Sequence, residues 1–206
     1  MLSAPAKPVL FLGCLLPFAW LFYAALTGQL GANPAEALIR ATGDWTLRFV
    51  CTVLAVTPLR VLTHTPALGR FRRMLGLFAF FYALLHLLSY AWFDMGLDVT
   101  DILKDIAKRP FILVGFSAVV MLTLLALTSF NRAIKAIGAK RWQALHKLVY
   151  VIACLGILHF FWMRSGKNDF AEVFVYAGVV ALLLGWRVVN ARRQKRLQPR
   201  IAAHRT

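Results

Sequence analysis

Three of the five histidines in the chain lie inside long apolar segments. His146 and His159 stand thirteen residues apart in LHKLVYVIACLGILHFFW, and His86 lies in RRMLGLFAFFYALLHLLSY. A neutral imidazole can bind a metal ion through either ring nitrogen. An ionisable side chain at membrane depth is unfavourable unless it has a partner, so such residues usually mark a functional site. These three histidines are therefore the first candidates for a binding site.

Six long apolar segments predict a membrane protein. The 206 residues are 60% hydrophobic with a mean hydropathy of +0.68, whereas soluble domains are roughly 45–50% apolar. Each segment is close to the ~20 residues that cross a ~30 Å hydrocarbon core as a helix. The first is expected to be retained rather than cleaved as a signal peptide, since Thr27-Gly28-Gln29 is a poor cleavage site. The sequence thus predicts an all-α bundle of six transmembrane helices, at Pro8–Thr27, Trp45–Leu62, Met74–Phe93, Phe111–Phe130, Leu145–Met163 and Phe170–Val189.

The net charge of +16 is distributed unevenly among the connections. The second connection, the fourth connection and the C-terminal tail carry Arg and Lys without acidic residues, and all eight acidic residues lie in or beside the other three connections. Because Lys and Arg mark cytoplasmic connections, both termini are expected in the cytoplasm. We therefore expect a membrane domain at 1–190 and a basic cytoplasmic tail at 191–206, which contacts anionic lipid rather than nucleic acid.

The longest outer connection, DVTDILKDIAKRP, carries Ile102 and Ile106 on one helical face. This pattern predicts a short amphipathic helix that lies flat on the membrane surface. On position alone, the segment Met95–Pro110 is also the best candidate for docking a partner on the outer side.

The predicted topology places two of the three histidines at a similar depth. His86 lies twelve residues into the third span, about 18 Å from its cytoplasmic end, and His159 lies about 20 Å beyond His146. Both are expected toward the outer leaflet, on different helices. Two imidazoles facing each other suit a six-coordinate haem iron, which takes two axial ligands from the protein.

Two other uses of these histidines agree less well with the sequence. A histidine can join neighbouring membrane helices by a hydrogen bond, but three histidines, two of them at matched depth, favour a site over three separate bridges. A proton relay usually includes carboxylates, and no Asp or Glu lies in the middle of a predicted span. No C-x-x-C-H, G-x-G-x-x-G or P-loop motif occurs, which argues against covalent c-type haem and a nucleotide-binding domain.

His146 and His159 are not expected to share one face of a straight helix. Thirteen residues at 100° each leave them about 140° apart. They could share a face only if the helix deforms, for which Gly156 is a candidate position; otherwise they serve two sites stacked across the membrane.

The segments RRMLGLFAFFYALLHLLSY and KRWQALHKLVYVIACLGILHFFW, together with AVTPLR, resemble the MsrQ (YedZ) family over essentially the whole chain. That family is the haem-binding membrane subunit of the bacterial protein-methionine-sulfoxide reductase system. It is grouped with ferric-reductase-like membrane domains, in which two helices each carry two histidines thirteen or fourteen residues apart and hold two b haems.

The present chain matches three of those four histidine positions, at His86, His146 and His159. At the fourth, Arg72 and Arg73 stand fourteen and thirteen residues before His86. The resemblance thus implies an outer haem on His86 and His159 and leaves an inner haem on His146 without an ordinary second ligand. Arg72 or Arg73 could pair with a haem propionate or occupy the open side; both could equally be positive-inside anchors.

The resemblance also implies a function in the bacterial inner membrane. Electrons from the quinol pool, or from a cytosolic flavin reductase, would pass through one or two b haems to a periplasmic molybdopterin-containing catalytic subunit that reduces methionine sulfoxide in oxidised proteins. FMN is associated with the family, and no residue here identifies its site. The chain itself shows no group suited to sulfoxide reduction.

Two alternative functions stay open at the level of sequence. The chain could be a stand-alone cytochrome b that reduces ferric iron or quinone without a molybdoenzyme partner. It could instead be a non-redox transporter or assembly factor whose histidines only pack.

Overall fold

The computed structural model describes residues 6–166 and 168–203, and within these ranges the chain is helical with no strand. Six helices among the described residues are long and apolar enough to cross a membrane, which confirms the predicted fold class. They are α1 (Ala6–Leu26), α2 (Pro34–Leu62), α3 (Arg72–Ser89), α5 (Pro110–Leu127), α8 (Leu148–Ser165) and α9 (Ala171–Ala203). Three shorter helices connect them: α4 (Val99–Lys108), α6 (Asn131–Ile137) and α7 (Ala139–Leu145).

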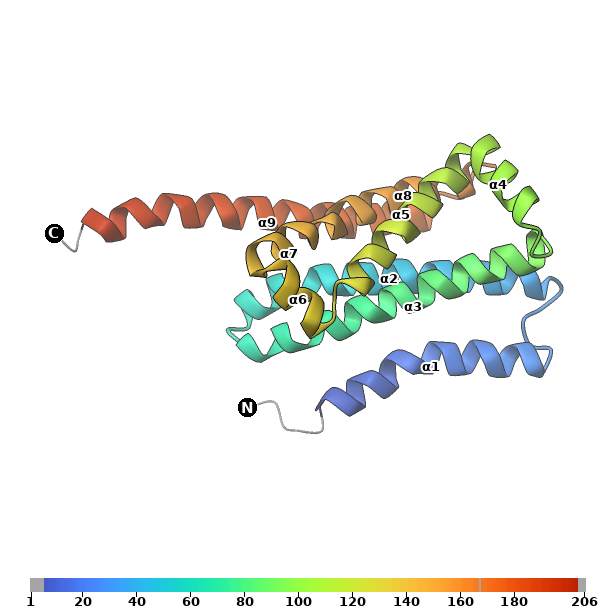
Figure 1. Cartoon of the computed structure of the whole chain (residues 1–206), viewed down its shortest axis with the longest axis horizontal. Coiled ribbons are helices and arrows are strands. Elements are labelled where there is room, and N and C mark those ends of the chain that lie inside the picture. Colours follow the sequence, from blue (N-terminus) through green and yellow to red (C-terminus); the bar gives the residue numbers. More distant parts are fainter. Residues whose placement is uncertain (1–5, 167, 204–206) are drawn as a thin grey trace.

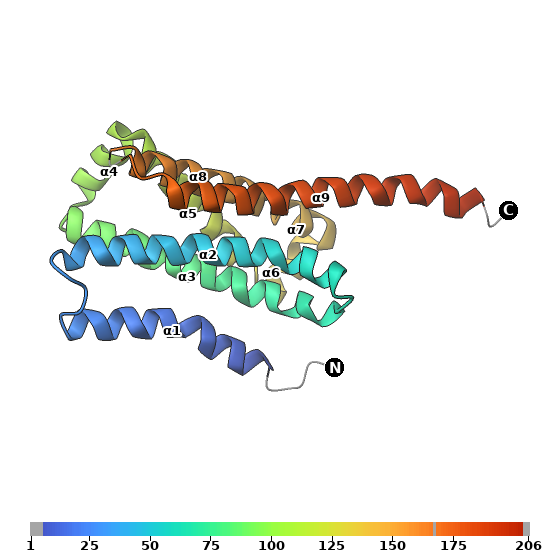
Figure 2. The same ribbon diagram turned by 180° about the vertical axis from the view of Figure 1, so that it is seen from behind.

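The long helices run side by side and the connections gather at two ends (Figure 1). At one end lie both ends of the described chain, the α2–α3 connection, α6 and α7; at the other lie the α1–α2 connection, α4 and the α8–α9 connection (Figures 1 and 2). We call these the basic end and the acidic end, after the charges of their connections. Placement of the basic end in the cytoplasm, like the division into a domain at 1–190 and a tail at 191–206, stays a prediction. His204 lies outside the described residues.

Two of the differences from the predicted spans have identifiable reasons, and a third is that α9 continues to Ala203, well beyond the predicted end at Val189. α2 begins at Pro34 rather than Trp45, with the Asn33 side chain accepting a hydrogen bond from the Glu36 N–H at its N-terminus. The early turns tolerate charge because Arg40 pairs with Glu36 at 2.5 Å. The predicted span Leu145–Met163 is interrupted, since the chain turns at residues 146–147 between α7 and α8.

The outer connection forms a helix, as its apolar pattern predicts. In α4 the Asp98 carboxylate accepts hydrogen bonds from the N–H groups of Thr100 and Asp101, which fixes the helix start. Ile106 is buried against the bundle, whereas Val99 and Leu103 on the same side stay exposed. α3 also continues into a short π-helical turn at Tyr90–Asp94, directly before this connection.

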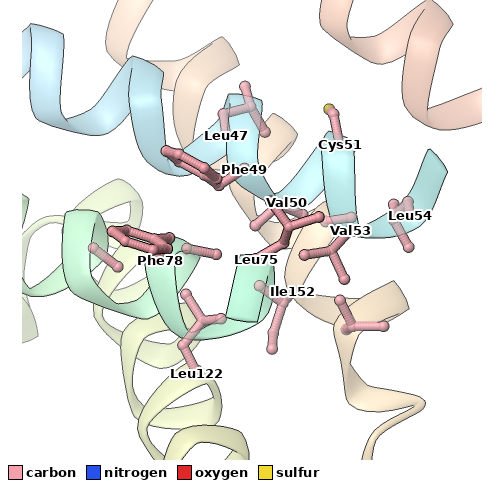
Figure 3. Packing of buried hydrophobic residues seen from close by; sticks show 14 of the residues in the cluster. Leu47, Phe49, Val50, Cys51, Val53, Leu54, Leu75, Phe78, Leu122 and Ile152 are labelled. Atoms are coloured by element: carbon pink, nitrogen blue, oxygen red, sulfur yellow. The ribbon is translucent and has the colours of Figure 1, made fainter. Parts of the chain in front are cut away.

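The hydrophobic core lies between α2, α3, α5 and α8. Figure 3 shows side chains of these helices interlocking, with Leu122 and Ile152 facing those of α2 and α3. By contrast, many large apolar side chains on the outside are exposed, for example Leu26 and Leu182 at 73% and 75%. Such an apolar exterior is expected where lipid rather than water surrounds the bundle.

One buried tyrosine of α3 makes hydrogen bonds to the backbone of α1, which also packs on the core through aromatic pairs. The Tyr82 hydroxyl donates to the Cys14 carbonyl at 2.9 Å and accepts from the Phe18 N–H at 3.0 Å. It therefore stands between two groups that would bond to each other in a regular helix, next to Pro17, where α1 bends (Figure 1). The ring of Tyr82 has no exposed surface and stacks on Phe49 at 5.1 Å.

Replacement Tyr82→Phe should lower the thermal stability of the detergent-solubilised protein. Removal of the hydroxyl takes away the partner of a buried carbonyl and of a partly buried N–H of α1, which corresponds to about 1–3 kcal/mol. The measurement is the unfolding midpoint of Tyr82→Phe beside that of Tyr23→Phe, a control in α1 whose ring is 51% exposed. Equal midpoints for the two variants would contradict the assigned role.

Candidate functional site

His86 of α3 and His159 of α8 meet inside the bundle, as the depth comparison predicts. Their ring centroids are 6.1 Å apart and the ring planes are inclined at 78°. Both residues are largely withdrawn from the surface. Two helices that are remote in the sequence thus bring two imidazoles to one place.

Each of these imidazoles is held by a hydrogen bond to a backbone carbonyl. His86 Nδ1 donates to the Ile39 carbonyl of α2 at 2.8 Å, and His159 Nδ1 donates to the Phe111 carbonyl of α5 at 2.7 Å. A carbonyl only accepts, so Nδ1 carries the proton and Nε2 keeps its lone pair. A metal-binding histidine typically has this arrangement, in which the second nitrogen fixes the tautomer and the ring orientation.

Two glycines make room for the rings. A Cβ atom at Gly43 of α2 would lie 3.1 Å from Cε1 of His86, and one at Gly115 of α5 would lie 2.7 Å from Nδ1 of His159. The second distance is shorter than real Cβ contacts allow. Each helix that supplies a carbonyl acceptor to one of the imidazoles therefore also has a glycine beside the same ring.

A cavity of about 260 Å³ adjoins both imidazoles, near the lower end of the roughly 300–1,000 Å³ typical of ligand pockets. Residues of α2, α3, α5 and α8 line it. Its wall toward the core is apolar, and charged side chains stand toward the acidic end. The apolar wall includes Val50, Ala83, Leu122 and Ile152, and the charged side chains are Arg40, Asp44, Asp94, Arg109 and Arg164.

The three arginines of this cavity each have an acidic partner. Arg40 pairs with Glu36, as described above, and Arg164 pairs with Asp169 at 3.1 Å and Glu172 at 2.6 Å. Arg109 pairs at 2.8 Å with Asp105, whose other oxygen accepts from the Tyr90 hydroxyl at 2.6 Å. The acidic end of the cavity therefore holds oriented guanidinium groups. Sequence reasoning did not single them out, because positive charge there runs against the general charge pattern.

The donor set suits an iron that needs only two ligands from the protein. Metal–imidazole bonds are about 2 Å long, so two imidazoles on opposite sides of one metal ion have ring centroids roughly 6 Å apart. Among the described residues no group of three or more His, Cys, Asp or Glu side chains could hold a bare ion. The pair, the apolar wall and the nearby arginines fit a haem, whose macrocycle supplies the remaining four ligands.

His146 lies apart from this pair, at the turn between α7 and α8. Its ring stacks on Trp142 with centroids 4.0 Å apart, and its Nε2 is 3.4 Å from the Thr128 hydroxyl. The indole N–H of Trp142 donates to the Thr128 carbonyl at 2.9 Å. The chain turns at His146, so the angle of about 140° between His146 and His159, which assumed one continuous helix, does not apply. The helix is deformed at residues 146–147 rather than near Gly156.

The two arginines singled out from the sequence lie in different surroundings. Arg72 is half-buried and within electrostatic range of His146 and Arg187. Arg73 is exposed, and its guanidinium donates to the Asn131 side chain at 2.7 Å. Arg187 stands close in the sequence to the basic tail predicted at 191–206.

Arg187 of α9 instead reaches into the bundle. It donates to the Leu54 carbonyl at 2.5 Å and to the Tyr150 hydroxyl at 3.4 Å. Its Nε is buried without a partner in the described part of the chain. Near the basic end, Arg72 therefore lies within electrostatic range of both His146 and Arg187.

Comparison with known proteins identifies similar chains over almost the full length. Residues 42–157 match the family described as ferric reductase like transmembrane component. A protein of Polaromonas naphthalenivorans is 74% identical over 99% of this chain and 95% of its own length. Proteins of Herminiimonas arsenicoxydans and Rhodospirillum rubrum are 58% and 47% identical, covering 92% and 90% of this chain and 87% and 88% of their own lengths. All three bear the name protein-methionine-sulfoxide reductase heme-binding subunit MsrQ. No solved structure matches the chain.

Replacement Gly115→Ala should destabilise the protein through the His159 ring. The new methyl group would overlap Nδ1, so the imidazole has to move and its bond to Phe111 is distorted, at a cost of about 1–3 kcal/mol. Gly76→Ala in α3 is the matched control, because no atom lies within 4 Å of its added Cβ; it should be neutral or stabilising by up to about 1 kcal/mol. Thermal midpoints that fall equally in both variants would refute the close contact.

Proposed function

Since the chain belongs to the MsrQ family of heme-binding subunits of protein-methionine-sulfoxide reductase, within the ferric-reductase-like membrane proteins, we propose that it binds haem b between His86 and His159. The observation that carries this proposal is the pair of imidazoles 6.1 Å apart. Each has its Nδ1 bound to a backbone carbonyl and its Nε2 left available as a ligand.

When bound, haem iron changes between its ferric and ferrous forms and so carries one electron. The chain supplies the environment for that change. His86 and His159 would supply the two protein ligands to the iron, the apolar wall would limit the access of water to it, and the Nδ1 bonds hold the orientation of the two rings. Arg40, Arg109 and Arg164 are suited to pair with the two propionates at the acidic end.

We propose a second, inner haem at His146. Support comes from its depth near the basic end and from the half-buried Arg72 within electrostatic range of it. Of the two arginines considered, Arg72 is better placed to pair with a propionate at this site, because it is half-buried and within electrostatic range of His146, whereas Arg73 is exposed. Whether the chain binds one haem or two therefore depends on whether His146 is a haem ligand.

We further propose that this subunit lies in the bacterial inner membrane with its basic end in the cytoplasm. It accepts electrons there from the quinol pool or from a cytosolic flavin reductase, with FMN as a further cofactor. It delivers them at the acidic end to a periplasmic molybdopterin-containing catalytic subunit that reduces methionine sulfoxide in oxidised proteins. The segment Met95–Pro110, which includes α4, is the proposed docking surface because it is the longest connection at that end.

A stand-alone ferric or quinone reductase is the main alternative function. Copurification of a molybdopterin-containing protein with the tagged chain from its native host would distinguish the proposed subunit from a stand-alone reductase. Recovery of the haem protein without such a partner, together with direct reduction of ferric iron or quinone, would favour the alternative.

Replacement of His86 or His159 should remove the haem proposed between them, together with its contribution to the low-spin b-type absorption. His86→Ala and His159→Ala each remove one axial ligand, which we expect to lower haem affinity by more than the ~10–100-fold that follows loss of an outer-sphere partner. The measurement is a dithionite-reduced minus oxidised spectrum of the purified protein. His64→Asn is the control, since His64 is exposed and its φ of 51° suits asparagine. An unchanged spectrum in His86→Ala would disprove the pairing.

A pyridine haemochromogen count tests the inner site. We expect two haems per wild-type chain, one in His146→Ala, and weakened retention of the second in Arg72→Gln. One haem in the wild type, unaffected by His146→Ala, would leave His146 as a packing residue. Complete absence of haem after haem-replete expression would disprove the electron-transfer function and favour a non-redox transporter or assembly factor.

A further inference from the structure

A second cavity lies at the basic end, away from the paired imidazoles. Its volume is about 780 Å³. It lies between the start of α3 and the segment that joins α5 to α6. Its lining residues are Arg73, Leu77, Ser129, Phe130, Asn131, Arg132 and Ala133. None of them lines the cavity beside His86 and His159.

The charge of this cavity is positive. Two of its lining side chains are the guanidinium groups of Arg73 and Arg132, and within the described part of the chain no acidic residue lines it. Arg73 is held in place by its hydrogen bond to Asn131, which is itself part of the wall. A planar guanidinium with a fixed orientation is well suited to bind a phosphate group. The cavity therefore favours an anion with several oxygen atoms.

The remainder of the wall is apolar and opens toward the outside of the bundle. Leu77 and Phe130 are 39% and 64% exposed. Leu127 and Leu124, about one and two turns before Phe130, continue this exposed apolar surface along α5 at 63% and 43%. A ligand that fills the cavity thus meets positive charge at the basic end and an apolar helix surface in the direction of the membrane interior. This combination matches a phosphate joined to acyl chains.

We propose that this cavity binds the headgroup of an anionic phospholipid. The phosphate lies between Arg73 and Arg132, and an acyl chain follows Leu77, Phe130 and the exposed leucines of α5. Basic pockets between membrane helices on the cytoplasmic side are known to select such headgroups. A free phosphate could use the same two arginines, but it would leave the apolar wall without a partner.

Lipid titration followed by native mass spectrometry tests the site in the full-length haem-loaded protein. The probes are dioleoyl phosphatidylglycerol, dioleoyl phosphatidylcholine and inorganic phosphate. The variants are Arg73→Gln, Arg132→Gln and the double variant. Arg70→Gln with Arg141→Gln is the matched control, because both arginines are exposed at the same end and do not line the cavity. Arg132→Glu adds a repulsive charge, and melting curves confirm that each variant is folded.

We expect phosphatidylglycerol to bind more tightly than phosphatidylcholine. Each single variant should weaken its binding about fivefold, as expected for one basic residue near a charged headgroup. The double variant and Arg132→Glu should weaken it further, and the control pair should leave it unchanged.

Three outcomes would overturn the proposal. An equal loss in the control pair would mean that only the net charge of the basic end matters. Equal binding of phosphatidylcholine would mean that the anionic charge is not recognised. Displacement of the lipid by millimolar inorganic phosphate would mean that the arginines serve a free phosphate rather than a lipid.

Discussion

The burial of two imidazoles in an apolar bundle is the constraint on which the rest of this structure depends. A polar ring nitrogen inside a membrane protein needs a partner, and here the partners are the carbonyls of Ile39 and Phe111. A carbonyl of a helix interior is already engaged along its own helix, so a ring reaches it only where the two helices come close. Gly43 and Gly115 provide that space. The pairing of α2 with α3, and of α5 with α8, therefore follows from the same requirement as the site.

In the surrounding helices, too, polar groups inside the bundle form hydrogen bonds to partners on other helices. Tyr82 completes the hydrogen bonding of α1 beside Pro17, and Arg187 connects α9 to α2 and α8. Both are polar side chains that reach a backbone or a hydroxyl group of another helix. In an environment where apolar contacts to lipid compete with contacts between helices, such bonds give the bundle its specific arrangement.

Much of the architecture could be predicted because it depends on local properties of the chain. The apolar segments give the six helices, and the constant rise per residue places His86 and His159 at one depth. The carbonyl partners could not be predicted, since every residue has a carbonyl and only the packing decides which one is reached. The turn at His146 was missed because its neighbours carry no Gly or Pro that would mark it. The early start of α2 was missed because the charged residues before Trp45 are typical of a polar connection, and only the structure shows that Arg40 pairs with Glu36.

The use of backbone acceptors has a consequence for how this site can change over evolutionary time. Substitutions at Ile39 or Phe111 leave a carbonyl oxygen in place, so these positions can drift among apolar residues without loss of the bonds that orient the imidazoles. Gly115 has no such freedom, because a Cβ atom there would enter the space of the His159 ring, and Gly43 has little, because a Cβ atom there would press on the His86 ring. The side chains of Ile39 and Phe111 can thus be replaced, although these residues bind the histidines. The identity of the two glycines is restricted, although they form no bond to the histidines.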